Sequence, residues 1–260
     1  MSVYESVLYE VGDRVATITL NRPQVLNAFD AQLRTDLIAA INEAVNDDRV
    51  RVAILTGAGR AFSAGADLRE ATPPEFLPQF QLDDEFKPGL MAIAHSAKPF
   101  ISAVNGVASG AAVGYAMACD MMMMADNAHL HLAFASVGLV PDAGTTWHLL
   151  HRLGPKKAYE IVIGAEKVSA QRCLELGLTN RVVPADGLLT SAHAWATQLS
   201  EKAPLVLRYV KESFRKVARM NLADAISYEA ALQNRLLRSQ DAQEGIRAFL
   251  EKRRPRFVGK

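Results

Sequence analysis

The stretch that decides the fold is "FISAVNGVASGAAVGYAMACD", residues 100–120, which carries no charge before its last residue. Its first five residues form a largely apolar run, typical of a strand buried on both faces. The turn-rich "NGVASG" and the small residues after it predict a helix that begins near Gly110 or Ala111. The uncharged length equals a nominal membrane span, but Ser102, Asn105, Ser109 and a predominance of alanine make insertion unfavourable. The sequence therefore predicts a buried strand, a turn and a helix.

The segments before and after this unit predict further strands and helices. "VATITL" (residues 15–20) and "RVAILTG" (51–57) are typical of strands, and "FDAQLRTDLIAAINEAVND" (29–47) has apolar residues at helical spacing with Asp30 as a candidate N-cap. "DMMMMAD" (120–126) predicts another buried strand; its methionines could line an adaptable pocket, but filling the core is the simpler interpretation. Residues 71–88 are rich in proline and acidic residues and predict a mobile excursion. This order favours an α/β fold.

The pattern changes to continuous helix after about residue 192. "APLVLRYVKESFRKVARM" (203–220) places Pro204 in a first helical turn and Val206, Val210, Phe214 and Val217 on one face. "LADAISYEAALQNRLLRS" (222–239) and "AQEGIRAFLEKR" (242–253) follow with similar amphipathic character. We therefore expect a core formed by residues 1–195 and a C-terminal helical region formed by residues 196–260. The apolar faces of that region need a packing partner, for which another subunit is a candidate.

Composition limits the partners and the location. The 260 residues include 29 Lys and Arg against 28 Asp and Glu, so no overall charge favours nucleic acid or an anionic membrane. Cys119 and Cys173 lie in apolar contexts without metal-type spacing, which argues against disulfides and for a reducing cytoplasm. His129 and His131 share one face of a predicted strand, but the sequence offers no third ligand, so we expect no metal site. The acidic N-terminal segment is unlike a signal peptide.

Two loops rich in small residues could present backbone N–H groups to a ligand. "GAGRAF" (57–62) lacks the third glycine of a dinucleotide-binding fingerprint, because Phe62 stands there. "SAGADL" (63–68) follows it, and small residues allow a ligand to approach such a backbone closely. The helix that begins near Gly110 directs free amides and a positive dipole end outward. If the two loops converge, they form an oxyanion hole; otherwise each is only a turn.

An isolated carboxylate marks "FASVGLVPDAGTTW" (134–147). Asp142 is the only acidic residue between Asp126 and Glu160, and its neighbours are small or apolar. It could cap the helix predicted for "AGTTWHLLHRLG", because aspartate is a favoured N-cap. Alternatively it acts as a base, with a dry apolar wall that includes Phe134, Val137 and Leu139 and raises its pKa. The residues alone leave both interpretations open.

The order of motifs along nearly the whole chain resembles the enoyl-CoA hydratase/isomerase (crotonase) family. The resemblance rests on "NRPQVLNAF", "GAGRAFSAGADL", "KPFISAVNGVASGAAVGYAMACD", "SVGLVPDAGTTWHLLHRLG", "SAQRCLELGLTNRVVP" and "EGIRAFLEKRRPRF". It implies a spiral ββα core with a helical C-terminal trimerisation region, assembled as a homotrimer or a dimer of trimers. It also implies acyl-coenzyme A thioesters as substrates, with no permanently bound cofactor and coenzyme A (CoA) as part of the substrate.

The resemblance assigns roles to individual positions. Ala66 and Ala111 match the residues whose amides hold the thioester oxygen. CoA is expected to be lined by Ala28, Ala64, Ala66, Asp67, Leu68 and Arg69. Phe257 and Lys260 match terminal residues that reach CoA bound to a neighbouring subunit. Asp120 ends its helix in a motif common to the family and is interpreted as structural. From the residues themselves, His95 could approach the pocket from a helix but is more simply a structural histidine, and Tyr115 either donates a hydrogen bond near the proposed hole or only packs.

The chain departs from the family's hydratases at two positions. Their two catalytic glutamates fall on Gly114 and Phe134, which disfavours ordinary hydration. Instead, "GLVPDAGTTW" resembles the subgroup that contains epoxyphenylacetyl-CoA isomerase and related enoyl-CoA isomerases, in which an aspartate at this place is the base. We therefore expect an isomerase with Asp142 as proton shuttle. The alternatives are an atypical hydratase, an aryl-CoA dehalogenase-like enzyme with Asp142 as nucleophile, and a non-catalytic acyl-CoA-binding protein.

Overall fold

The computed structural model describes residues 4–70 and 77–260, and its core contains two β-sheets. The larger sheet has the strand order β1-β2-β3-β5-β7-β10, and its pairs are parallel except the antiparallel β1–β2 edge. Its strands are β1 (Val7–Gly12), β2 (Val15–Leu20), β3 (Val52–Gly57), β5 (Phe100–Val104), β7 (Met121–Ala125) and β10 (Arg181–Val183). The smaller sheet has the order β4-β6-β8-β9, with β4 (Ala61–Ser63), β6 (Val107–Ser109), β8 (His129–His131) and β9 (Lys167–Ser169).

The chain winds between the two sheets in repeated ββα units. A strand of the larger sheet is followed by a strand of the smaller sheet and then by a helix: β5, β6 and α4 (Ala111–Ala118), then β7, β8 and α5 (Thr145–Gly164). The crossings are tight, because a Cβ at Gly106 would lie 2.1 Å from the carbonyl oxygen of Arg60. The buried Asn27 amide fixes the preceding crossing by donating to the carbonyls of Ala58 and Ala61 at 2.9 and 2.8 Å.

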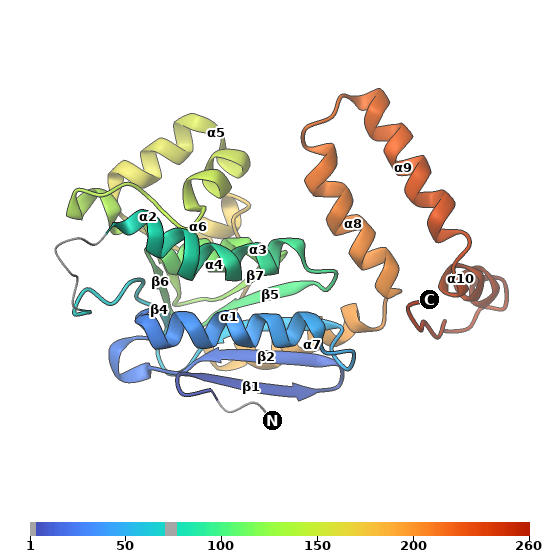
Figure 1. Cartoon of the computed structure of the whole chain (residues 1–260), viewed down its shortest axis with the longest axis horizontal. Coiled ribbons are helices and arrows are strands. Elements are labelled where there is room, and N and C mark those ends of the chain that lie inside the picture. The colour runs from blue at the N-terminus through green and yellow to red at the C-terminus, as the bar shows by residue number, and fades with distance from the viewer. Residues whose placement is uncertain (1–3, 71–76) are drawn as a thin grey trace.

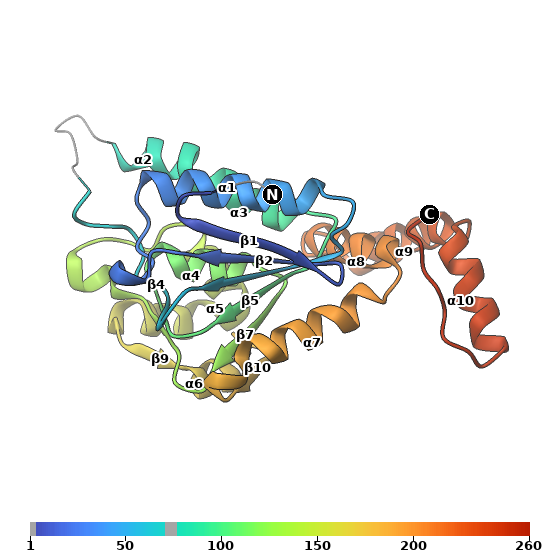
Figure 2. The ribbon, with the colours of Figure 1, turned by 90° about the horizontal axis from the view of Figure 1, so that it is seen from below.

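Helices cover both faces of the larger sheet. α1 (Ala31–Asn46) and α3 (Lys87–His95) lie on one side, and α7 (Leu188–Ser200) lies on the other (Figure 2). α6 (Ala170–Glu175) packs beside β8, β9 and β10. The predicted N-cap of α1 is confirmed, because the Asp30 side chain accepts a hydrogen bond from the Leu33 amide. The strands predicted around "VATITL", "RVAILTG", "FISAV" and "DMMMMAD" are also confirmed, and four of the five β7 residues are buried in the core.

The structure differs from the sequence predictions in two places. Residues 78–88 belong to the predicted mobile excursion, but they are helical. They form α2 (Pro78–Gln81), a single π-helical turn (Leu82–Phe86) and the start of α3. The prolines are tolerated because they stand in the first turns of α2 and α3, where a backbone N–H has no helical acceptor. Residues 71–76 lie outside the described residues. Strand β1, which was not predicted, pairs with β2 as a half-exposed edge strand.

The C-terminal helices form an arm that extends away from the sheets (Figure 1). The arm consists of α8 (Pro204–Val217), α9 (Leu222–Leu236) and α10 (Gln240–Leu250). The boundary expected after residue 195 falls inside α7, which remains on the sheet, and the arm starts at Pro204. Lys211 of α8 tethers the arm by donating to Asp120 Oδ2 and to the Ile93 carbonyl, both at 2.7 Å.

The arm exposes the apolar faces that the sequence predicts for it. Phe214 is 70% exposed and Phe249 is 83% exposed, and Val206 and Val210 are also exposed. No helix among residues 4–70 and 77–260 combines the length and the apolar character that a membrane crossing requires. The residues of "FISAVNGVASGAAVGYAMAC" lie instead in β5, β6, α4 and their connections: the predicted strand and helix are confirmed, and the predicted turn contains the short strand β6.

Candidate active site

The two small-residue loops meet where they follow β4 and β6, which are paired strands of the smaller sheet. A Cβ at Gly65 would lie 2.7 Å from the Ser109 carbonyl oxygen and 3.4 Å from Gly110 Cα. Both glycines also have positive φ, +89° for Gly65 and +55° for Gly110. A side chain at Gly65 would therefore both clash and strain the backbone, so the close approach of these loops depends on glycine. The structure thus brings the predicted donors Ala66 and Ala111 into neighbouring loops.

Both candidate donors have free amides. Ala111 is the first residue of α4, and its N-cap, Gly110, makes no side-chain capping bond. Ala66 forms a parallel bridge with Phe29, in which Gly65 and Asp67 make the hydrogen bonds: the Phe29 amide donates to Gly65 at 2.8 Å and the Asp67 amide to Phe29 at 3.0 Å. Within residues 4–70 and 77–260, neither the Ala66 nor the Ala111 amide donates to an intramolecular acceptor. That these amides form an oxyanion hole stays a prediction.

Asp142 lies in the loop before α5, and its carboxylate is poorly solvated. Its Oδ1 atom is buried and has no hydrogen-bond partner in the described part of the chain. Burial raises the pKa of Asp142 to about 6. The interpretation of Asp142 as a helix cap is wrong, because Gly144 is the N-cap of α5 and no side chain caps this helix. A partly desolvated carboxylate with one unpartnered oxygen and a raised pKa has the properties of a general base.

The Asp142 loop rests directly on α4. A Cβ at Gly114 would lie 2.2 Å from the carbonyl oxygen of Ala143 and 2.8 Å from its Cβ. The loop turns sharply here, since Ala143 and Gly144 have φ values of +49° and +78°. Left-handed geometry is uncommon for alanine and indicates that the surrounding contacts impose it. Gly114 thereby brings Asp142 beside the helix whose first residue is Ala111.

The apolar wall predicted around Asp142 is only partly present. Phe134 is 7% exposed, but Val137 and Leu139 are 60% and 63% exposed, so they do not form a dry wall. The reason is local: a short helical turn (Ala133–Val137) ends in left-handed Gly138, and the chain then runs along the surface. Asp142 is therefore buried mainly because its loop packs against α4, and Val137 and Leu139 contribute little.

Sequence reasoning missed His148, which lies one turn into α5. Its Nδ1 accepts a hydrogen bond from Arg152 Nη1 at 2.9 Å, and a guanidinium can only donate, so the imidazole proton is on Nε2. Burial, and then Arg152, lower the pKa of His148 to about 4, which keeps the ring neutral. Its Nε2 lies 4.0 Å from the Cβ position of Gly144, beside the Asp142 loop. The i, i+4 spacing of His148 and Arg152 on a predicted helix was the sequence signal that could have indicated this contact.

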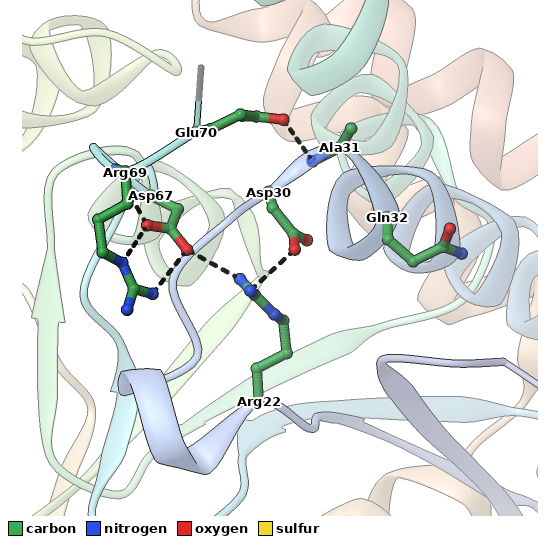
Figure 3. Close-up of a pocket in the computed structure, with 7 residues that line it drawn as sticks. All are labelled: Arg22, Asp30, Ala31, Gln32, Asp67, Arg69 and Glu70. Atoms are coloured by element: carbon green, nitrogen blue, oxygen red, sulfur yellow. Dashed lines mark hydrogen bonds and ion pairs between the residues drawn. The ribbon is translucent and has the colours of Figure 1, made fainter.

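Two of the residues predicted to line CoA, Asp67 and Arg69, border an open pocket of about 440 Å³, whose other lining residues are Arg22, Asp30, Ala31, Gln32 and Glu70 (Figure 3). Asp67 accepts from Arg22 at 3.3 Å and from Arg69 at 2.9 Å, and these bonds hold the pKa of Asp67 well below its usual range. Arg69 is largely exposed at the rim, as is Leu68, which is 87% exposed.

The other predicted CoA residues lie on the adjoining backbone. Arg22 Nη1 donates to the Ala28 carbonyl at 2.6 Å, and the Ala64 amide donates to Leu26 at 2.9 Å. Ala28, Ala64 and Asp67 thus belong to one connected region. Their role in binding CoA stays a prediction.

Phe257 and Lys260 lie apart from this region. The Phe257 carbonyl accepts from Arg51 Nη2 at 2.9 Å, and the Lys260 carbonyl accepts from the Asp241 amide at 3.2 Å. The first bond ties the terminal segment to the residue before β3, and the second folds it onto α10, at the opposite end of the molecule from β4 (Figure 1). Within one chain the structure does not bring these two residues to Asp142 or to the pocket, so only a second chain could place them there.

Tyr115 and Asp120 have partners within the fold. Tyr115 is fully buried and its hydroxyl donates to the Phe86 carbonyl at 3.3 Å. Asp120 forms the ion pair with Lys211, and His95 lies at the exposed end of α3. His129 and His131 lie on β8, and across the described ranges no group of three potential His, Cys, Asp or Glu ligands is assembled.

The sequence and the fold match known proteins over their whole lengths. Residues 10–260 match the family model for enoyl-CoA hydratase/isomerase. A probable enoyl-CoA hydratase of Rhodobacter capsulatus is 37% identical over 257 residues, which is 99% of each chain. The 1,2-epoxyphenylacetyl-CoA isomerase of Escherichia coli is 35% identical over 260 residues, covering 98% of this chain and 99% of the relative.

Solved structures agree with the fold. An enoyl-CoA hydratase/isomerase from Mycobacterium paratuberculosis has a TM-score of 0.88 at 36% identity, covering 99% of this chain and 100% of that chain. An enoyl-CoA hydratase from Bacillus anthracis has a TM-score of 0.93 at 29% identity, covering 98% and 100%. The expected spiral ββα core and helical C-terminal region are thereby confirmed. The chain belongs to the enoyl-CoA hydratase/isomerase family.

Proposed function

We propose that this enzyme is an acyl-CoA isomerase that shifts a double bond, or rearranges a ring, in a CoA thioester. The observation that carries the proposal is the Asp142 carboxylate, whose buried Oδ1 has no partner in the described part of the chain and whose pKa is raised to about 6. A 1,3-proton shift needs one group that removes a proton and returns it elsewhere. Similarity to the Escherichia coli protein named 1,2-epoxyphenylacetyl-CoA isomerase supports the same reaction class.

For a 3-enoyl-CoA the steps balance without water. Asp142 removes a proton from C2, and the electrons of the C–H bond pass into a dienolate whose negative charge lies on the thioester oxygen. The free amides of Ala66 and Ala111 stabilise that charge, each by about 3 kcal/mol in comparable oxyanion holes. Protonated Asp142 then delivers the same proton to C4, the carbonyl re-forms, and the product is the conjugated 2-enoyl-CoA.

Hydration is the second candidate, because several relatives, including the one from Rhodobacter capsulatus, are named enoyl-CoA hydratases. Two observations argue against it. A glutamate at Gly114 has no room, since even a Cβ there would overlap the Ala143 carbonyl. The buried Phe134 occupies the place of the other hydratase glutamate and cannot activate water.

We further propose that CoA occupies the region around Asp67 and that the enzyme works as a homotrimer or a dimer of trimers. The pocket beside Asp67 and the exposed Arg69 support the first proposal. The exposed apolar residues of the arm, Phe214 and Phe249 among them, support the second, because an apolar face of this kind gains stability by burial against another chain.

The test is a panel of 3-enoyl, 2-enoyl and aromatic CoA esters, with product identity followed by mass spectrometry and by the absorbance of the conjugated thioester. We expect isomerisation of a 3-enoyl-CoA, and a rate about 10²–10⁴-fold lower in Asp142→Asn. Asp48→Asn, which changes an exposed aspartate on the surface, is the matched control. Faster hydration of crotonyl-CoA than isomerisation, or full activity in Asp142→Asn, would refute the proposal. A covalent adduct on Asp142 would instead identify a nucleophilic role.

A further inference from the structure

Phe134 stands next to the junction of the two candidate amide loops. The tip of its ring, Cζ, lies 3.9 Å from the Cβ position of Gly110, and Gly110 is the residue that contacts Gly65. The side chain is 7% exposed, so it is held among neighbours and does not lie on the surface. The edge of a large apolar ring therefore borders the space between the Gly65–Ala66 and Gly110–Ala111 loops.

The Asp142 loop rests on the same helix, α4. Gly110 is the N-cap of α4 and Gly114 lies inside the helix, so the two glycines are about one helical turn apart, roughly 6 Å along the axis. Phe134 lies against the first of these glycines and Ala143 lies against the second. Phe134 thus lies against the start of α4, and the Asp142 loop lies against its next turn.

Hydrogen bonds fix Phe134 in this place. The Gly110 amide and the Ser109 hydroxyl both donate to the His131 carbonyl at 3.2 Å, which ties the end of β8 to the start of α4. The Leu139 amide donates to the Phe134 carbonyl at 2.9 Å and closes the turn that carries the ring. The backbone is therefore held on both sides of Phe134.

We propose that Phe134 is a shielding residue that keeps water away from the proton held by Asp142, so that the site returns the substrate's own proton. This inference rests on the proposed isomerase function. A protonated carboxyl group exchanges with bulk water when water can reach it. A buried Oδ1 and an apolar ring one turn away slow that exchange relative to the second proton transfer. Phe134 then determines whether the proton removed from C2 is returned to the substrate or is replaced by a proton from water.

The experiment uses a 3-enoyl-CoA that carries two deuterium atoms at C2, incubated with the full-length enzyme in ordinary water. Retention gives a 2-enoyl-CoA with one deuterium at C2 and one at C4, whereas exchange gives a product with deuterium only at C2. Mass spectrometry and deuterium NMR at low conversion measure the ratio of the two products. We expect the wild type to form mainly the doubly labelled product.

Phe134→Ala is expected to raise the ratio of singly to doubly labelled product roughly threefold or more, because it opens the site to water. Phe134→Leu keeps an apolar side chain and should give an intermediate ratio, and it remains informative if the alanine variant is unstable. Val137→Ala changes an exposed residue of the same turn and should leave the ratio unchanged. A merely structural role for Phe134 would lower the rate or the thermal stability without changing the ratio.

The outcomes separate the two proposals. Normal isomerisation with the same label ratio in the wild type and both Phe134 variants would overturn the shielding role and leave the isomerase function intact. A wild type that isomerises but loses nearly all transferred label would overturn it as well. A wild type that does not isomerise the labelled ester would overturn both proposals.

Discussion

Replacement of Gly114 by alanine tests whether the contact between α4 and the Asp142 loop positions the base. The added Cβ would lie 2.2 Å from the Ala143 carbonyl oxygen, whereas unstrained contacts of this kind lie at about 3.5 Å. The nearest atoms belong to backbone, so no side-chain rotation relieves the overlap. The loop must move away from α4 by roughly 1 Å, and Asp142 moves with it.

We expect Gly114→Ala to have a small effect on stability and a large effect on the rate. Overpacking costs about 1–3 kcal/mol, and alanine's better helix propensity returns about 1 kcal/mol of that. The melting temperature should therefore fall by only a few degrees, at about 2–4 °C for each kcal/mol in a chain of this size. A displacement of about 1 Å at a catalytic group can lower the rate about 10²-fold. We expect this loss in kcat, with KM little changed because the binding loops stay in place.

The assay is 3-enoyl-CoA isomerisation together with thermal unfolding at one fixed protein concentration. Gly187→Ala is the matched control, because its Cβ would meet no atom within 4 Å and its φ of −96° suits alanine. That variant should be indistinguishable from the wild type in both measurements. If Gly114→Ala keeps kcat within about twofold of the wild type, positioning of Asp142 by this contact is refuted.

Three further predictions concern the ionisation of Asp142 and the ion pair between Asp120 and Lys211. The isomerisation rate should rise with pH with a midpoint of about 6, because Asp142 must be ionised to act as the base, and a flat profile through this region would exclude it. Asp142→Asn should be more stable than the wild type above pH 6 and about as stable below pH 3.8. The reason is that the pKa of Asp142 is higher in the folded state, so the wild type loses stability as the pH rises between these two values. Thermal unfolding at several pH values checks this. Lys211→Met should lose about 1–3 kcal/mol, because Asp120, whose side chain is 25% exposed, and the Ile93 carbonyl both lose a charged hydrogen-bond donor, and the double variant with Asp120→Asn should recover part of this loss in denaturant unfolding.

Much of the fold could be predicted because its signals are local. The uncharged run through β5, β6 and α4 combines strand, turn and helix signals in one segment, and the structure follows them. Strand β1 also had a signal that was not used, since alternate residues of "VLYEVG" face solvent, in the period-two pattern of an edge strand. The helix α2 and the start of α3 were missed because the proline-rich and acidic composition of residues 71–88 was interpreted as an excursion, although the prolines of α2 and α3 stand in first turns.

The site could be predicted only in part, because the remaining information lies in contacts between distant segments. Asp142 was detectable as an isolated acid, but only the geometry of Gly144 excludes a capping role. The exposure of Val137 depends on where a left-handed turn directs the chain, which its own residue type does not reveal. His148 acquires its protonation state from Arg152 on the same helix, and its relation to the Asp142 loop depends on the start of α5.

Gly114 links the loss of the hydratase residues to the presence of a new base. The contact that leaves no room for a side chain at Gly114 is the same contact that seats Ala143 on α4 and brings Asp142 to the helix. The loop pays for this position with a left-handed alanine and an unpartnered carboxylate oxygen, both of which are unfavourable in isolation. Such a combination persists only where the surrounding core holds it, and Gly114 is part of a helix in which seven of eight residues are buried. A glutamate at Gly114 would therefore displace the base instead of adding a second acid, so the two chemistries exclude each other at this position.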